Sequence, residues 1–277
     1  MRLSKLAFCI MALIISISAS PWALAGEVLD RIKSRGVIKV ATDPAWPPYS
    51  WRNEKGEWQG FDAAVAEEIS KRMGVKLEFV TPNWDVITSG EWNGEWDLSV
   101  GSMSPTEDRA KRLVFPAVYY YAPTVLAVHK DNTTILSPSD ATGKRVGTLK
   151  GSIFEKYVRH EPMGMADELP PAYKINQPVV VTFDTSELSF NELIKGRDGT
   201  LDAMVDDLMY FLFHIKQGAP IRIVGQPLYY GPSAVAIGPG DDEFKTLLQD
   251  IVSSMHEDGT LSALSNKWFG VDLTRKF

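Results

Sequence analysis

The sequence contains very little cysteine and histidine. Its single cysteine, Cys9, lies in the first 25 residues, and its four histidines are scattered at positions 129, 160, 214 and 256. Beyond the first 25 residues this distribution excludes disulfide bonds and a cysteine nucleophile, and the histidine spacing is not that of a metal site. We therefore expect no cofactor and no metal, and a fold of about 250 residues stabilised by its apolar core.

Long hydrophobic runs are also missing after the N-terminal stretch. That stretch, MRLSKLAFCIMALIISISASPWALA, carries Arg2 and Lys5, continues in an apolar run and ends in Ala-Leu-Ala. This order is typical of a cleaved secretory signal peptide. A transmembrane anchor is the alternative, but it needs about 20 uninterrupted apolar residues. We predict a signal peptide over residues 1–25 and a secreted protein, with the periplasm as the expected location.

Basic residues are outnumbered, and no run of Lys or Arg stands out. The formal net charge is −6, and removing the two basic residues of the first 25 gives −8. Nucleic-acid binding requires a basic surface, so this balance excludes nucleic acid as the expected partner. The acidity favours solubility and says little about function.

No repeat, low-complexity tract or long polar linker interrupts the chain. Instead, helical and strand-like patterns alternate, and apolar runs closed by glycine are followed by amphipathic segments. The predicted strands cover residues 37–42, 75–80, 95–103, 144–151, 178–183, 201–207, 221–225 and 233–238. The predicted helices cover residues 28–36, 61–74, 152–160, 186–196 and two helices within 242–270. This alternation predicts an α/β fold with mostly parallel sheets flanked by helices.

The strand and helix patterns form two clusters, which favours two lobes. Two similar segments, FPAVYYYAPTVLAV and GQPLYYGPSAVAIG, are the expected crossings between them. Plain buried strands are the alternative for both segments. We predict lobe 1 from residues 26–121 plus 231–277, and lobe 2 from residues 122–230.

The stretch MSPTEDRAKRLVF, residues 103–115, has the pattern of a helix start. Ser104 can cap, Pro105 suits the first helical position and Glu107 falls where a capping box needs an acid. Arg109 follows, and a guanidinium near a helix N-terminus is well suited to bind a carboxylate. A solvated surface arginine is the alternative.

Several segments together resemble the family-3 periplasmic solute-binding proteins, the receptors of polar amino-acid ABC importers of the lysine/arginine/ornithine- or glutamine-binding type. The resemblance rests on ATDPAWPPYSW, GEWQGFDAAVAEEISKRMG, NWDVITSGEWNGEWDLSVGSMSPTEDRAKRLVFPAVYY, VGTLKGSIFEKY and GTLDAMVDD, in the family's order. It implies a two-lobed type II periplasmic-binding-protein fold with two hinge crossings. It also implies a monomer that traps a free polar amino acid, with a basic one favoured, and delivers it to an inner-membrane ABC permease.

The resemblance also implies a set of site residues. The ligand carboxylate is expected at Arg109, with Ser102, Ser104 and Thr106 beside it. Lobe 2 is expected to add Ser152, followed by Ile153 where the family usually carries Thr, so one hydroxyl is missing. Asp207 falls on the family's amine-binding aspartate, although a turn acid that caps the next helix is the alternative.

The selectivity pocket implied by the resemblance consists of Asp43, Trp46 and Trp84, an acid with two aromatic rings that suit a cationic side chain. Tyr49 and Trp51 fit core packing and ligand contact equally well. Asp206 adds a second negative charge next to Asp207.

Two other functions fit the same scaffold. One is a periplasmic lyase of the cyclohexadienyl-dehydratase type, which needs a general acid such as Asp43 or the Asp206–Asp207 pair. The other is a partner protein that has lost its ligand, which the presence of both Arg109 and Asp207 disfavours. We predict a binding protein rather than an enzyme.

Overall fold

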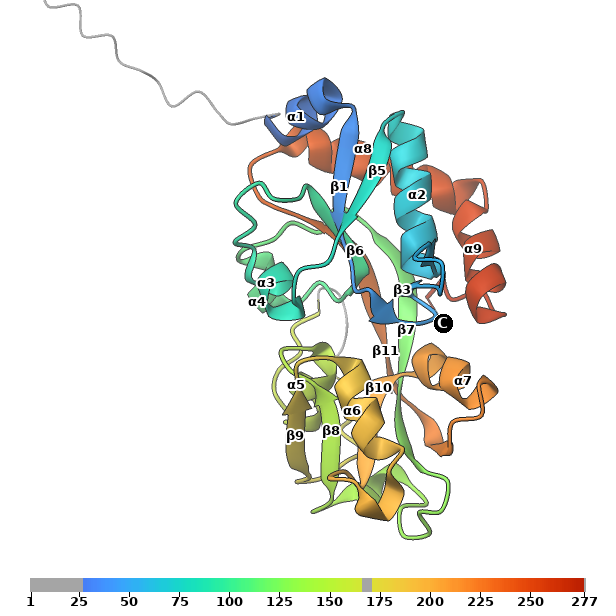
Figure 1. Cartoon of the computed structure of the whole chain (residues 1–277). Helices are drawn as coiled ribbons and strands as arrows, with labels where there is room; N and C mark the ends of the chain where they lie inside the picture. The colour runs from blue at the N-terminus through green and yellow to red at the C-terminus, as the bar shows by residue number, and fades with distance from the viewer. Residues whose placement is uncertain (1–26, 166–170, 277) are drawn as a thin grey trace, which may run out of the picture.

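The computed structural model describes residues 27–165 and 171–276 (Figure 1). The predicted signal peptide and Cys9 lie outside the described residues. The described chain forms two halves, drawn one above the other in Figure 1, and two long strands pass through both. Among the described residues, no helix is both long and apolar enough to cross a membrane.

The main sheet joins eight strands in the order β5-β1-β6-β11-β7-β10-β8-β9. Their bounds are β1 Val37–Ala41, β5 Lys76–Val80, β6 Leu98–Met103, β7 Val118–His129, β8 Arg145–Leu149, β9 Val179–Phe183, β10 Ala203–Asp207 and β11 Ile221–Ile237. The outer strands pair in parallel: β1 with β5 and β6, and β8 with β9 and β10. A small antiparallel sheet is formed by β2 Ala45–Trp46, β3 Ser50–Arg52 and β4 Trp58–Gln59.

Helices cover both faces of this sheet, as an α/β fold requires. The half with β1, β5 and β6 carries α1 Glu27–Arg35, α2 Phe61–Met73, α3 Trp84–Ser89, α4 Glu107–Ala110, α8 Asp242–Glu257 and α9 Thr260–Phe269. The other half carries α5 Ile153–Val158, α6 Ser186–Leu193 and α7 Leu208–Lys216. Short 3₁₀ helices span Pro138–Ala141 and Gly196–Asp198.

The two predicted crossing segments form the long antiparallel strands β7 and β11. Their pairing runs from Ile221 opposite His129 to Ala234 opposite Val118, with two shifts of register. Because these strands also pair with β10 and β6, they connect the two halves by backbone hydrogen bonds. The predicted lobe boundaries fall inside β7 and β11, so the division into 26–121 plus 231–277 and 122–230 stays a proposal.

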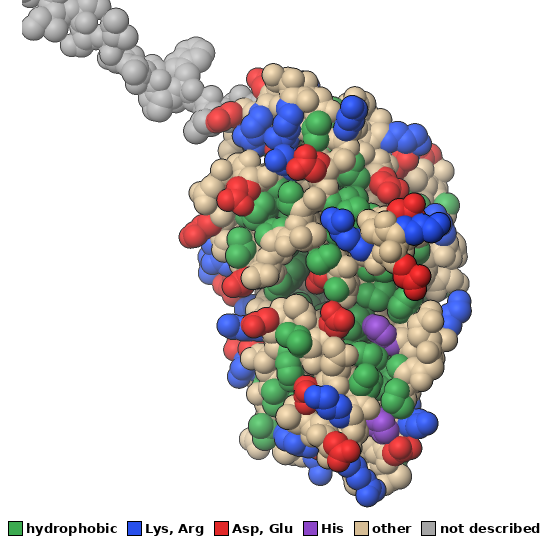
Figure 2. Space-filling view, in the orientation of Figure 1, with side chains coloured by type: hydrophobic (Ala, Val, Ile, Leu, Met, Phe, Trp, Pro, Cys, Tyr) green, Lys and Arg blue, Asp and Glu red, His purple; other side chains and the backbone are tan. Residues whose placement is uncertain are grey.

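Alternation along β7 shows how the apolar core is built. Val125 and Ala127 pack with one apolar cluster, whereas Leu126 and Val128 pack with another on the opposite face. This is the period-two pattern of a strand buried on both sides. Apolar side chains also gather on the surface between the two halves (Figure 2).

Four short features differ from the sequence-based prediction. Helices α3 and α7 and the small sheet β2-β3-β4 were not predicted. The helix expected from Ser104 and Pro105 is a single turn that begins at Glu107, and its N-cap is Thr106. The Ser104 carbonyl accepts hydrogen bonds from the Thr106 N–H and from the Arg109 guanidinium, so Ser104 precedes the helix instead of capping it.

Candidate functional site

A cavity lies between the two halves of the molecule, and part of it is open to solvent. Its walls are formed by Thr42, Asp43, Trp46, Trp84, Ile87, Gly101, Ser102, Ser104, Arg109, Leu149, Ser152, Ile153, Phe154 and Ser186. Most of the predicted site residues are in this list, but Thr106 and Asp207 are not.

The sheet topology explains why these residues meet. Asp43 follows β1, Ser102 lies near the end of β6, and Leu149 ends β8. Ser186 opens α6 just after β9. Ligands of open parallel sheets bind outside the carboxyl ends of the strands, and here two such edges face each other across the cavity.

Among the described residues of the cavity wall, Arg109 is the only basic one, and its side chain is buried. One terminal nitrogen donates to the Ser104 carbonyl at 2.9 Å, and the other donates to the Gly151 carbonyl of the opposite half at 3.1 Å. Its guanidinium carbon lies 5.2 Å from the ring centre of Trp84. Among the described residues no carboxylate pairs with it, and burial lowers its pKa to about 10.

Two hydroxyls predicted to contact ligand act as helix caps. Thr106 Oγ1 accepts the Arg109 N–H at 3.3 Å, which fixes the backbone of Arg109. Ser152 Oγ accepts the Glu155 N–H and donates to the Leu149 carbonyl. Thr106 therefore positions Arg109 from behind the wall, while Ser152 both caps α5 and lines the cavity. Ile153 lines the cavity with an apolar side chain, as its difference from the family's Thr implies.

Further contacts join the halves around the cavity. The Glu107 N–H donates to the Gly164 carbonyl at 2.7 Å, and Lys156 pairs with Asp108 at 2.9 Å. Together with the bond from Arg109 to Gly151, these contacts describe a closed arrangement of the two halves.

Asp43, Trp46 and Trp84 line the cavity together, whereas Tyr49 and Trp51 do not. An Asp43 carboxylate oxygen accepts the Ala45 N–H at 2.7 Å, and burial raises the pKa of this carboxyl. Tyr49 is fully buried and stacks on Trp46, so it belongs to the core.

Asp207 is placed behind the cavity wall. One of its carboxylate oxygens accepts the Tyr49 hydroxyl and also the Met209 N–H, so Asp207 caps α7. Its second oxygen is buried without a hydrogen-bond partner, and burial raises the pKa of this carboxyl to about 8. The helix-capping alternative for Asp207 is therefore observed, and its predicted contact with a ligand ammonium is untested.

Two more carboxyls are buried behind the wall. Asp206 accepts hydrogen bonds from the Ser186 hydroxyl and the Asp207 N–H, and Asp62 accepts them from Ser102 and Tyr119. Burial raises the pKa of each to about 7. Ser102 supports this arrangement with a left-handed backbone, φ +53°, which directs its N–H to the Tyr119 hydroxyl.

Sequence reasoning missed Asp62 and Ser186, and it missed the apolar wall residues Ile87, Leu149 and Phe154. The positions of Leu149 and Ser186 could have been predicted, because both flank predicted turns from a strand to a helix, where ligands of parallel sheets bind. Ile87 lies on α3, which was not predicted. Among the described residues, no group of three or more His, Cys, Asp or Glu side chains could hold a metal ion.

Comparisons with known proteins identify the family of the chain. The family described as bacterial extracellular solute-binding proteins, family 3, matches residues 38–271. The L-cystine-binding protein of Escherichia coli strain K12 is 27% identical over 267 residues, 96% of this chain and 94% of its own. The histidine-binding periplasmic protein of Salmonella typhimurium strain LT2 is 27% identical over 248 residues, 85% of this chain and 88% of its own.

Solved structures share the fold. An ancestral arginine-binding protein bound to arginine has 32% identity and a TM-score of 0.73, covering 85% of this chain and 99% of its own. An ancestral amino acid-binding protein described as a precursor of cyclohexadienyl dehydratase has 29% identity and a TM-score of 0.75, covering 87% and 99%. The two-lobed α/β architecture predicted from the sequence is confirmed.

Proposed function

Because the chain belongs to the family-3 bacterial extracellular solute-binding proteins, we propose that it binds a free α-amino acid in the cavity between its halves and delivers it to an inner-membrane ABC permease. Arg109 is the observation that carries this proposal. Its buried guanidinium faces the cavity and, within the described part of the chain, donates to two backbone carbonyls, so it can bind an incoming carboxylate with its remaining N–H groups.

Closure of the halves is the proposed mechanism of capture. In an open form the ligand carboxylate meets Arg109 and the strand ends of the first half. Gly151 and Ser152 of the second half then approach, and the exclusion of water strengthens each polar contact. The permease is proposed to recognise the closed form, with the protein acting as a periplasmic monomer after removal of residues 1–25.

A binding function without catalysis is favoured over the dehydratase-type alternative. The relatives compared above are named as binding proteins. Of the carboxyls considered as a general acid, Asp206 and Asp207 lie behind the cavity wall and are hydrogen-bonded to protein groups, whereas Asp43 lines the cavity. Incubation with prephenate or arogenate is expected to give no product, and turnover would support the enzyme instead.

A melting-temperature screen of refolded, ligand-stripped protein against the twenty amino acids tests the proposal. A ligand that binds only the folded state stabilises it by RT ln(1 + L/Kd), where L is the free ligand concentration, so the melting temperature rises with the logarithm of the ligand concentration once that concentration exceeds the dissociation constant. At least one amino acid is expected to do so. If none does, the amino-acid-binding function is wrong.

A further inference from the structure

One buried hydrogen bond connects the two halves behind the cavity. The Tyr49 hydroxyl, between β2 and β3 of the first half, donates to the carboxylate of Asp207 at the end of β10 in the second half. Both residues are fully buried. The Tyr49 ring stacks on Trp46 of the cavity wall. Asp206, which precedes Asp207, accepts the hydroxyl of the wall residue Ser186. The contact therefore lies directly behind the wall.

The Tyr49 side chain is held in place by the first half. Its backbone N–H donates to the Trp46 carbonyl at 3.0 Å, and its carbonyl accepts the Asp62 N–H at 2.8 Å. Its ring also packs against Tyr120 and Phe269, whose ring centres lie 5.7 Å and 5.1 Å away. Because the backbone and the ring are both fixed, the fold of the first half sets the position of the hydroxyl.

The Asp207 carboxylate is bound through one of its two oxygens. That oxygen accepts both the Tyr49 hydroxyl and the Met209 N–H, and the other is buried without a hydrogen-bond partner in the described part of the chain. Two donors on one oxygen restrict the rotation of the carboxyl and leave the second oxygen for a donor from outside the chain. Buried polar atoms are nearly always hydrogen-bonded, and the ammonium of an amino acid is a donor that suits this oxygen.

The hydrogen bond from Tyr49 also favours the charge state that an ammonium needs. Burial is the main reason that the pKa of Asp207 is raised to about 8, and Asp206 and Asp62 act in the same direction. The hydrogen bonds from Tyr49 and Met209 lower this pKa, because they stabilise the ionised carboxylate. Loss of the Tyr49 hydroxyl would therefore leave the Asp207 carboxyl less well oriented and more often protonated.

We propose that Tyr49 is a positioning residue of the ligand site: from the first half, it holds the Asp207 carboxylate of the second half in the orientation that receives the ligand ammonium. Because the two residues belong to different halves, this orientation is complete only when the halves are closed. The role deepens the proposed function and rests on it, and it adds a residue that does not line the cavity.

Removal of single hydroxyls tests this role. Tyr49→Phe removes the hydroxyl that binds Asp207 and keeps the ring. Tyr210→Phe is the matched control, because Tyr210 is also fully buried and its hydroxyl has no hydrogen-bond partner among the described residues. Titration calorimetry uses the tightest binder of the twenty amino acids. We expect at least fivefold weaker binding by Tyr49→Phe and less than a twofold change for Tyr210→Phe. A smaller loss in Tyr49→Phe would overturn the role of Tyr49 and leave the proposed function standing, whereas a wild type that binds no amino acid would overturn the proposed function itself.

A ligand without an ammonium distinguishes positioning from a general structural effect. The probe is the carboxylic acid that lacks only the α-amino group of the same amino acid, such as glutaramate for glutamine, and its affinity is measured by displacement of that amino acid. Tyr49→Phe is expected to bind the acid within twofold of the wild type, because the proposed contact of the carboxylate is Arg109. An equal loss of affinity for the amino acid and for the acid would contradict the proposal.

A double variant gives an independent check. If Tyr49 acts through Asp207, Tyr49→Phe should weaken amino-acid binding by less than twofold when it is added to Asp207→Asn. The same loss in both backgrounds would show that Tyr49 does not act through Asp207. Circular dichroism establishes that each variant is folded.

Discussion

At the residue scale, Arg109 combines three properties that a surface arginine lacks. It is buried, its backbone is held by the Thr106 cap, and its guanidinium reaches carbonyls of both halves. A buried cation is tolerated only when it is hydrogen-bonded and paired. Here the protein provides the hydrogen bonds, and the proposed ligand provides the carboxylate.

Arg109→Lys is expected to weaken amino-acid binding by about tenfold or more, because an ammonium cannot reproduce the two-pronged contact with a carboxylate. Arg109→Ala should cost on the order of 100-fold or more, because a charged hydrogen-bonded partner of the ligand is lost. Titration calorimetry measures both. The exposed Arg112→Lys serves as the control, and equal affinities for Arg109→Lys and Arg112→Lys would contradict the assignment.

The sequence was sufficient to predict most residues of the cavity wall, but not how each is used. Trp46, Ser102 and Arg109 come from motifs with recognisable neighbours, and they line the cavity. Asp207 matched its motif equally well, yet it caps α7 and accepts the Tyr49 hydroxyl. This contact joins residues 158 positions apart, and no local pattern reports it.

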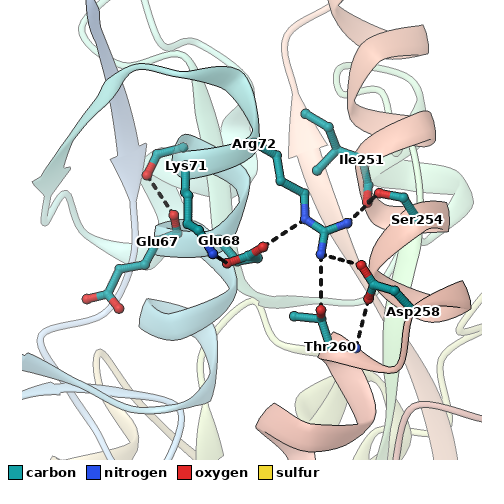
Figure 3. Close-up of polar contacts among 9 residues, drawn as sticks. Glu67, Glu68, Lys71, Arg72, Ile251, Ser254, Asp258 and Thr260 are labelled. Atoms are coloured by element: carbon teal, nitrogen blue, oxygen red, sulfur yellow. Dashed lines mark hydrogen bonds and ion pairs between the residues drawn. The ribbon is translucent and has the colours of Figure 1, made fainter.

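At the element scale, the side chain of Arg72 connects α2 to α8 and to the start of α9 by hydrogen bonds (Figure 3). It binds Glu68 on its own helix at 2.8 Å, Ser254 at 2.6 Å and Asp258 at 2.7 Å, and it also donates to Thr260. These charge-assisted hydrogen bonds fix the packing of three helices over one face of the sheet.

Arg72→Met is expected to lower the free energy of unfolding by about 2 kcal/mol, because it keeps the apolar stem but removes the charged hydrogen bonds. Lys71→Met is the matched control, since Lys71 is exposed and pairs only with Glu68 in this network. Urea denaturation compares the two variants. Equal effects of both, or a change in ligand affinity for a folded Arg72→Met, would show that the network has a different role.

Long amphipathic helices such as α2 and α8 were predictable because their periodicity and glycine or acidic boundaries agree with their packing. Helices α3 and α7 were not. Helix α3 has six residues, too few for a period to emerge, and LMYFLFHIK of α7 is apolar on nearly every side. Helix α7 is stabilised by the Asp207 cap and by tertiary contacts. Neither contribution is included in helix propensities, so the sequence pattern alone did not predict this helix.

At the scale of the whole molecule, the buried carboxyls predict an unusual dependence of stability on pH. The pKa values of Asp62 and Asp206 are raised to about 7 and that of Asp207 to about 8, mainly by burial. The folded state therefore holds protons that the unfolded state releases near pH 4. The contribution of these three protonated carboxyls to the free energy of unfolding is fully present below about pH 4, and it is lost as the pH rises through the folded-state pKa values of about 7 and about 8.

The free energy of unfolding is thus expected to fall between about pH 5 and pH 8, each carboxyl contributing up to about 1.4 kcal/mol per pH unit. His214 acts in the opposite direction, because burial lowers its pKa to about 4 and its contribution is lost as the pH falls from 6.5. Because three carboxyls lose their contribution as the pH rises and only one imidazole gains its own, the net free energy of unfolding is expected to fall over this interval. Urea titrations at several pH values measure the slope, and Asp62→Asn should make it shallower. A stability that rises over this interval would contradict the prediction.

The two-lobed architecture was predictable as a whole, since alternating elements and the order of several family segments agree. The placement of the lobe boundaries was not, because β7 and β11 are continuous strands that pair through both halves. Their hydrogen bonds cross the point at which a sequence-based division must be drawn.

Native mass spectrometry gives the most direct test of amino-acid binding through Arg109. The ligand-stripped wild type and the Arg109→Ala variant are each incubated with an equimolar mixture of the twenty amino acids. The wild type is expected to gain a single added mass equal to one amino acid, and Arg109→Ala to gain none. A wild type without an adduct, or the same adduct in equal amount on both proteins, would contradict the central claim.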